Sequence, residues 1–201
     1  MKILYWILIP AGAYLIGSLN FSIVLSKVFL GKDIRKQGSG NAGATNMTRV
    51  FGWFAGLATL AFDVLKAFLA MRIGRKLLGD TGVCLAGMGV MLGHCFPVFH
   101  HFKGGKGIAT GAAVSFMIDW RVGVSVVVAF LIGALVSKKV SVGSILASVT
   151  IVPSTWIFAP RPSMLALSVF GMVLAVSRHK ENIRRLVDGT EPNFRAGKGN
   201  K

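Results

Sequence analysis

The stretch VGVSVVVAFLIGALVS, residues 122–137, runs for sixteen positions without a charged side chain. A helix of roughly 20 apolar residues crosses a lipid bilayer, and this stretch nearly reaches that length. Working outward, the chain has further apolar segments at 3–30, 51–71, 82–93, 108–118, 142–159 and 163–177. The 201 residues are 53% hydrophobic and only 15% charged, which excludes disorder and disfavours an ordinary soluble fold. We therefore predict an all-α, polytopic membrane helix bundle that forms one integral-membrane domain over residues 1–201.

The number of crossings depends on two short segments, 82–93 and 108–118. If neither crosses, the bundle has five spans; if both cross, it has about seven. With seven spans and the N-terminus outside, the inner face carries 15 Lys and Arg residues and the outer face 6. The positive-inside rule favours this arrangement, which puts the C-terminus in the cytoplasm. It also places every polar motif on one face, so we predict seven.

The ends of the chain and its few unusual core residues permit simpler predictions. The first apolar run is too long for a signal peptide and is expected to remain as a helix. Cys84 and Cys95 lack the spacing of a metal site and are expected to be small core residues. Asp63 and Lys66, three residues apart in one apolar segment, are expected to form a structural ion pair. Residues 186–201 are expected to be a flexible basic tail. No metal and no cofactor is predicted.

The formal charge of +16 indicates an anionic partner. In a soluble protein it would suggest nucleic acid, but the apolar segments make anionic lipid or an anionic substrate the better explanation, with no nucleic acid. The candidate sites for such an anion are three polar segments that interrupt the apolar pattern.

The first segment is GSGNAGATNMTR, residues 38–49. Its glycines, Gly40 among them, allow backbone N–H groups to approach an anion closely. Arg49 can bind an oxyanion with two hydrogen bonds. The uncharged side chains predicted to join it are those of Ser39, Asn41, Thr45 and Asn46. The alternative is a solvated turn between helices, in which Asn and Gly serve turn geometry only.

The second segment is GHCFPVFHHFKGGKGIATG, residues 93–111. Its GGKG core is not a nucleotide-binding P-loop, which would need a Gly five positions before Gly105 and a Ser or Thr after Lys106. What remains is a set of backbone N–H groups, the charge of Lys106 and a helix start near Ile108, which together suit phosphate. The predicted phosphate-binding residues are Lys103, Gly104, Gly105, Lys106, Gly107 and Thr110. The alternative is a basic loop that contacts anionic lipid headgroups.

The third segment is SRHKENIRR, residues 177–185, where the last apolar segment ends. His179 and Asn182 are three residues apart and would share one face of a continuing helix. The alternative is basic anchoring after a transmembrane helix. A shorter stretch, SKKVSVGS at 137–144, places Ser141 and Ser144 at a helix start, where hydroxyls cap the helix or bind an anion.

Together the three segments resemble the bacterial membrane glycerol-3-phosphate acyltransferases that use acyl phosphate, the PlsY family, in order and spacing over nearly the whole chain. The resemblance implies transfer of a fatty acyl group from acyl phosphate to the 1-hydroxyl of sn-glycerol 3-phosphate, giving 1-acyl-sn-glycerol 3-phosphate and phosphate, the first step of phospholipid synthesis. It further implies a monomer in the bacterial cytoplasmic membrane with the active site facing the cytoplasm. The family's first motif often has Pro where this chain has Ala42.

Residue roles follow from combining the resemblance with the chemistry of the side chains. We expect Lys106, Arg49, Ser39 and the Gly104–Gly105 amides to bind phosphate, and His179 with Asn182 to orient the glycerol hydroxyl or the phosphate. The H-x-x-x-x-D pair of other acyltransferases is absent, because no His is followed five positions later by Asp. Two other classes remain open: a transporter of phosphorylated metabolites, which would need polar residues at mid-membrane, and a structural binder of anionic lipid.

Overall fold

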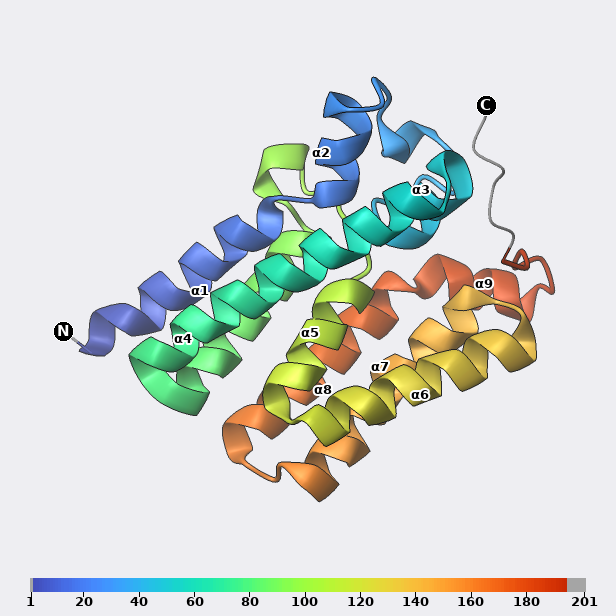
Figure 1. Cartoon of the computed structure of the whole chain (residues 1–201). Coiled ribbons are helices and arrows are strands. Elements are labelled where there is room, and N and C mark those ends of the chain that lie inside the picture. The colour runs from blue at the N-terminus through green and yellow to red at the C-terminus, as the bar shows by residue number, and fades with distance from the viewer. Residues whose placement is uncertain (1, 195–201) are drawn as a thin grey trace.

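A computed structural model describes residues 2–194 as a bundle of helices with no strand in that range (Figure 1). The polypeptide is helical wherever apolar runs lack turn residues, as backbone hydrogen bonds must be satisfied within each segment in lipid. The elements in chain order are α1 (Lys2–Ser18), α2 (Phe21–Val28), η1 (Ile34–Lys36), α3 (Ala44–Phe51), α4 (Trp53–Cys95), η2 (Val98–His100), α5 (Ile108–Ile118), α6 (Trp120–Ser137), α7 (Val140–Phe158), α8 (Pro162–Arg178) and α9 (Lys180–Val187). The all-α prediction is confirmed.

Helix α4 is a hairpin of two arms rather than one rod. Leu78 and Gly79 leave helical geometry, and Gly79 has a φ of +56°. The two arms then lie so close that a Cβ on Gly82 would come within 1.9 Å of the Gly74 carbonyl oxygen. Figure 1 shows the arms running back along each other. The apolar segments predicted at 51–71 and 82–93 are therefore separate helices, each longer than predicted.

Helix α1 packs on the second arm of α4 through small residues. A Cβ on Gly89 would lie 2.4 Å from the carbonyl oxygen of Pro10, and one on Gly93 would lie 2.1 Å from that of Tyr14. Small residues allow this kind of backbone contact between helices in a membrane, where no hydrophobic effect drives association. The packing fixes the end of the second arm, where the polar loops begin.

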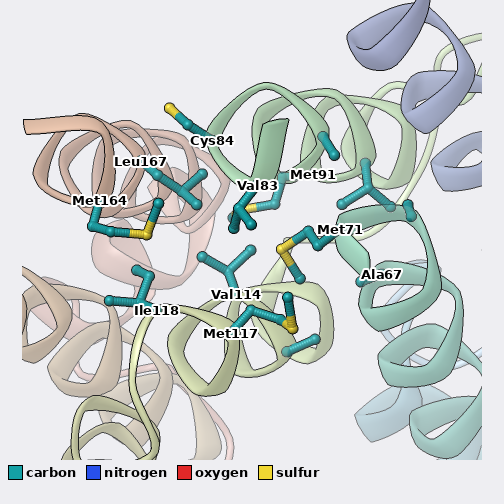
Figure 2. Packing of buried hydrophobic residues seen from close by; sticks show 14 of the residues in the cluster. Ala67, Met71, Val83, Cys84, Met91, Val114, Met117, Ile118, Met164 and Leu167 are labelled. Carbon is teal, nitrogen blue, oxygen red and sulfur yellow. The ribbon is translucent and has the colours of Figure 1, made fainter. Parts of the chain in front are cut away.

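The core lies among both arms of α4, α5 and α8 (Figure 2). Val83, Met91, Val114, Met164 and Leu167 are almost fully buried there. Cys84 and Cys95 are free and buried, which confirms the prediction that they are core residues. This core holds the short helix α5, whose start carries the glycine-lysine loop.

Membrane crossing is supported by length and composition for part of the bundle. Within residues 2–194, four stretches suffice on their own: Ile3–Val28, Trp53–His100, Trp120–Ser137 and Val140–Phe158. Helix α8 qualifies together with α9, across a bend of 57°. With 11 residues at about 1.5 Å each, α5 is about 16 Å long, roughly half the hydrocarbon thickness. Seven crossings and the orientation of the termini stay predictions.

The polar loops gather at one end of the bundle. Figure 1 shows α2, α3, η2 and α9 at the end opposite the N-terminus of α1. The three polar segments belong to these elements and to the loops between them. One end of an otherwise apolar bundle thus carries nearly all of its hydrogen-bonding loops.

The prediction of a flexible tail over 186–201 is wrong for its first part. Residues 188–194 are held by specific contacts: the Glu191 side chain is buried, the Phe194 N–H donates to the Lys138 carbonyl oxygen over 2.9 Å, and the Phe194 ring meets the Trp53 ring edge-on. The tail is fixed because a buried carboxylate anchors it. Residues 195–201 lie outside the described residues.

Replacing Gly89 with Ala should destabilise the bundle, whereas the same change at Gly12 should not. A Cβ at Gly89 meets backbone atoms of α1, so α1 must shift, at a cost of about 1–3 kcal/mol. Gly12 has nothing within 4 Å of its position for a Cβ, and Ala there should gain about 0.5–1 kcal/mol in helix stability. Thermal unfolding in detergent should show opposite shifts. Equal shifts would contradict the close-packing interpretation.

Candidate active site

The first polar segment is a loop organised around Asn46 on α3. The Asn46 side chain is 1% exposed; its amide N–H groups donate to the carbonyl oxygens of Ile34, Gln37 and Asn41, and its Oδ1 accepts from the Ser39 N–H. The two amide N–H groups are shared among these three acceptors, and Oδ1 accepts one hydrogen bond. Asn46 therefore shapes the loop and has no free donor for a substrate.

The other predicted residues of this segment remain accessible. Ser39 and Gly40 are exposed at the loop's tip, and Asn41, Thr45 and Arg49 are half-buried. Among residues 2–194 the Arg49 guanidinium has no ion pair. Arg49 is thus a cation whose charge is available to an anion.

The second segment packs against His94, at the end of α4. The Gly105 N–H donates to the His94 carbonyl oxygen over 3.0 Å. A Cβ on Gly105 would lie 2.2 Å from Nε2 of His94 and 2.7 Å from the Ala42 carbonyl oxygen. The loop can therefore pass only where Gly105 has no side chain. The contact with Ala42 also brings the first and second segments together.

The loop leads directly into α5. Gly107, in left-handed geometry with a φ of +82°, precedes the helix, and the buried Thr110 hydroxyl donates back to the Gly107 carbonyl oxygen over 3.1 Å. Thr110 is thus occupied in shaping the helix start. Lys103 is exposed, whereas Gly104 and Gly105 are buried. Of the two lysines, Lys106 is the one that turns toward the rest of the site.

Lys106 joins the second segment to the third. Its ammonium donates to Oδ1 of Asn182 on α9, and Nε of Arg178 donates to the Gly105 carbonyl oxygen over 3.4 Å. Burial, and next the nearby positive charge of Arg185, lower the pKa of Lys106 to about 8. A dianionic phosphate beside it would favour the charged ammonium. The site is therefore built to gain from binding an anion.

His179 lies at the bend between α8 and α9 and is 3% exposed. Its Nδ1 is 2.8 Å from the Ala175 carbonyl oxygen, which can only accept, so Nδ1 carries the proton. Burial lowers the pKa of His179 below its usual value, and the hydrogen bond to Ala175 offsets only part of this. The imidazole is then neutral at pH 7, with the Nε2 lone pair free to accept a proton or a hydroxyl hydrogen bond.

Glu191 completes the site and was not anticipated from the sequence. Its carboxylate accepts from Nδ2 of Asn182 and from Nε of Arg185, each over 2.7 Å. Burial alone would raise the pKa of Glu191, but interactions with Ser141, Asn182 and Arg185 hold it below the usual value. Because the Asn182 amide donates to Glu191, its oxygen must face Lys106. No spacing signal marks Glu191, since it follows a short helix and a turn.

The two serines of α7 differ in availability. The Ser144 hydroxyl donates to the Val140 carbonyl oxygen over 3.0 Å, a local helix contact. The Ser141 hydroxyl is buried beside Glu191, whose pKa it helps to lower, but it makes no hydrogen bond of ordinary geometry within residues 2–194. A ligand could offer this hydroxyl a better-placed partner. Ser141, close to Glu191, is therefore the better candidate for substrate contact.

The geometry thus brings all three segments together at Gly105 and Lys106. The first touches Gly105 through Ala42, and the third reaches both residues through Arg178 and Asn182. The result is a cluster of cations, backbone N–H groups and a neutral imidazole at one end of a membrane bundle. Such a site suits an enzyme that handles phosphorylated substrates beside a membrane.

Comparison with known proteins agrees with this class. A family model described as glycerol-3-phosphate acyltransferase matches residues 7–189, so the chain belongs to that family. It is 44% identical over 191 residues to a glycerol-3-phosphate acyltransferase of Thermoanaerobacter pseudethanolicus, covering 94% of this chain and 95% of that protein. A relative of the same name from Thermotoga petrophila is 37% identical over 187 residues, covering 92% and 95%.

Two solved structures share the fold. One is PlsY (YgiH), an integral membrane glycerol 3-phosphate acyltransferase, in its glycerol 3-phosphate form, with a TM-score of 0.90 and 35% identity over 94% of this chain and 96% of that one. The lysophosphatidic acid form gives 0.86 and 34%, over 97% and 96%. The resemblance noted from the three segments is confirmed, as are an integral-membrane helical fold and membership of an enzyme family of acyltransferases.

Replacing Glu191 with Gln should destabilise the protein, because Asn182 and Arg185 each donate to a different oxygen of Glu191 and Gln has only one acceptor oxygen. One buried donor is then left without a partner, at a cost of about 1–3 kcal/mol. The matched control is Asp188→Asn, which breaks an exposed ion pair with Arg184 and should cost at most about 0.5 kcal/mol. Thermal unfolding measures both. Similar shifts for the two variants would show that Glu191 does not anchor the site.

Proposed function

We propose that the protein transfers a fatty acyl group from acyl phosphate to the 1-hydroxyl of sn-glycerol 3-phosphate, giving 1-acyl-sn-glycerol 3-phosphate and phosphate. The observation that carries this is the meeting of Lys106 with Asn182, which unites the glycine-lysine loop with the His179 helix bend. Phosphate-binding groups and a neutral imidazole thus share one site. The two similar structures, PlsY in a glycerol 3-phosphate form and in a lysophosphatidic acid form, support the same reaction, since these are the proposed acceptor and product.

Two phosphate groups have to be held at once, one on each substrate. Cations and polar groups from different segments are available to them: Arg49 with Ser39 from the first, and Lys106 with the Gly104 backbone from the second. The Gly105 N–H, which was also predicted to bind phosphate, already donates to the His94 carbonyl oxygen. Guanidinium groups bind phosphate with two parallel hydrogen bonds, whereas an ammonium acts as a point charge. Ser141 adds a buried hydroxyl beside Glu191, close to the third segment.

Acyl transfer at this site needs no covalent enzyme intermediate, because acyl phosphate already has a good leaving group. The glycerol hydroxyl oxygen attacks the acyl carbon; the new ester C–O bond forms as the bond from the acyl carbon to the phosphate oxygen breaks. Phosphate leaves with the electron pair, stabilised by Lys106. The hydroxyl proton passes to Nε2 of His179 or to the leaving phosphate. Positioning and charge neutralisation supply the rate enhancement.

The apolar bundle fits a substrate with a fatty chain. The acyl chain would lie against the helices while its phosphate stays at the loop end, so that both substrates meet at the membrane surface. In a bacterium the protein would lie in the inner membrane with this end on the cytoplasmic side, in keeping with the excess of basic residues at this end. One chain supplies every group named above, so the proposed active unit is the monomer, over a single domain.

A transporter of phosphorylated metabolites would need free polar groups at mid-membrane. The two charged residues buried in the first arm of α4, Asp63 and Lys66, form an ion pair with each other, and Lys66 also donates to backbone carbonyl oxygens. No observation therefore favours transport over catalysis.

Purified protein given palmitoyl phosphate and sn-glycerol 3-phosphate should release phosphate only when both are present. Lys106→Ala should lower kcat/KM at least about 100-fold, the order seen when one group that stabilises a transition-state charge is removed. The control is Lys32→Ala, which removes an exposed charge at the same end and should change little. Release of phosphate without the acceptor, or full activity of Lys106→Ala, would refute the proposal.

The pH dependence should report Lys106 directly. Since its pKa in the free protein is about 8, kcat/KM should fall as pH rises through that value and the ammonium loses its charge. Lys106→Arg keeps a charged group at any working pH, so its fall should move to higher pH even if the rate at pH 7 is lower. An unchanged alkaline limb in that variant would show that another group titrates there.

A further inference from the structure

An intramembrane lysine lies beneath the proposed phosphate loop. Lys66, on the first arm of α4, is 5% exposed; its ammonium donates to the carbonyl oxygens of Gly17 over 2.9 Å and Leu19 over 2.7 Å, and lies 2.7 Å from Oδ1 of Asp63. By geometry the ammonium has three hydrogen-bond acceptors, the two carbonyl oxygens and Nδ1 of His94, whereas its contact with Asp63 is an ion pair without a hydrogen bond of ordinary geometry within residues 2–194. Gly17 and Leu19 lie at the end of α1, where helix carbonyls lack helical partners. Lys66 therefore holds the break between α1 and α2.

The same pair supports the ring of His94 on the second arm. Nδ1 of His94 is 3.3 Å from the Lys66 ammonium and 3.6 Å from Oδ1 of Asp63. The other nitrogen, Nε2, lies against Gly105, whose N–H donates to the His94 carbonyl oxygen. One buried imidazole thus touches the ion pair with one edge and the glycine-lysine loop with the other.

The direction of the Lys106 side chain depends on this contact. Its neighbour Gly105 is held on its N–H side by His94 and at its carbonyl oxygen by Arg178. With both ends of that residue fixed, the backbone leaves Gly105 in one direction, and Lys106 reaches Asn182. A tilt of the His94 ring would move the loop's N–H groups and the ammonium together.

We propose that Lys66 is a positioning residue that, through His94, sets the glycine-lysine loop for phosphate binding. This rests on the proposed function, in which Lys106 binds substrate phosphate. Charges in a bilayer are expensive, and apolar residues of similar volume often replace a buried ion pair without loss of stability. What apolar residues cannot supply is directed donors to two carbonyls together with a polar contact for His94. A role limited to closing the end of α1 would leave the loop unaffected.

The test compares Lys66→Met, His94→Phe and the double variant, by kcat and by KM for glycerol 3-phosphate. His94→Phe keeps both buried charges and a ring, so it isolates the nitrogen contacts. Each single variant should lower kcat/KM by about 10- to 100-fold, mainly through KM, as expected when the binding groups are misplaced by about 1 Å. The double variant should be no worse than the worse single one, because both changes cut the same connection.

The control is Thr59→Val, which removes a buried hydroxyl of the same arm that bonds only locally to Ala55 and should leave KM unchanged. If Lys66→Met does not fold, Asp63→Asn/Lys66→Met removes both charges together and takes its place. Additive losses in the double variant, or a wild-type KM in His94→Phe, would overturn the positioning role.

Failure of the proposed function is separable from failure of this inference. If the wild type does not acylate glycerol 3-phosphate, inorganic phosphate serves as the probe, and its stabilisation of the protein against heat is compared across the variants. Phosphate should then raise the wild-type melting temperature more than that of His94→Phe. Equal shifts, or no shift in the wild type, would overturn the inference.

Discussion

The contact of the Gly105 backbone with His94 is the constraint on which the site depends. A loop rich in N–H groups between apolar helices must have those groups either bonded or facing a ligand, because an unbonded buried donor is costly. At Gly105 the N–H is bonded to His94, the carbonyl oxygen accepts from Arg178, and no side chain fits in between. This anchored residue lets its neighbour Lys106 carry a charge at a partly buried position without a carboxylate partner among residues 2–194.

The fold was largely predictable, since apolar runs of this length have few alternatives to helices in lipid. Segment ends were less so. The apolar segment was predicted to end at residue 71, yet the first arm of α4 continues to the reversal at Leu78 and Gly79. In this extension Arg75 donates to the Met117 carbonyl oxygen over 2.9 Å, at the end of α5. A cation just after an apolar run can thus donate to a carbonyl oxygen at the end of a neighbouring, shorter helix.

For the site, side-chain chemistry predicted which segments take part better than it predicted the role of each residue in them. Spacing predicted that His179 and Asn182 act together, and short-range chemistry marked Lys106. The same chemistry suggested Asn46 as a substrate ligand, although in the structure the Asn46 side chain makes its hydrogen bonds within its own segment of the chain. Glu191 escaped notice because its partners converge only after the chain turns at Gly189, whose φ of +69° no helical periodicity encodes. Roles that depend on tertiary contacts are invisible to spacing.

The distribution of acids explains how the excess positive charge is directed. The chain has only seven Asp and Glu residues, and six of them have basic partners in the structure: Asp33, Asp63, Asp80, Asp119, Asp188 and Glu191. These acids serve helix caps, turns and the tail or, in the case of Asp63, the buried pair with Lys66, so within residues 2–194 they form no ion pair with Arg49 or Lys106. Two phosphate dianions brought to this end would meet a field already positive and partly shielded from water, where charge interactions are stronger than in bulk solvent. At the loop end, Arg49 and Lys106 thus keep positive charges that no ion pair in the described part of the chain, residues 2–194, neutralises.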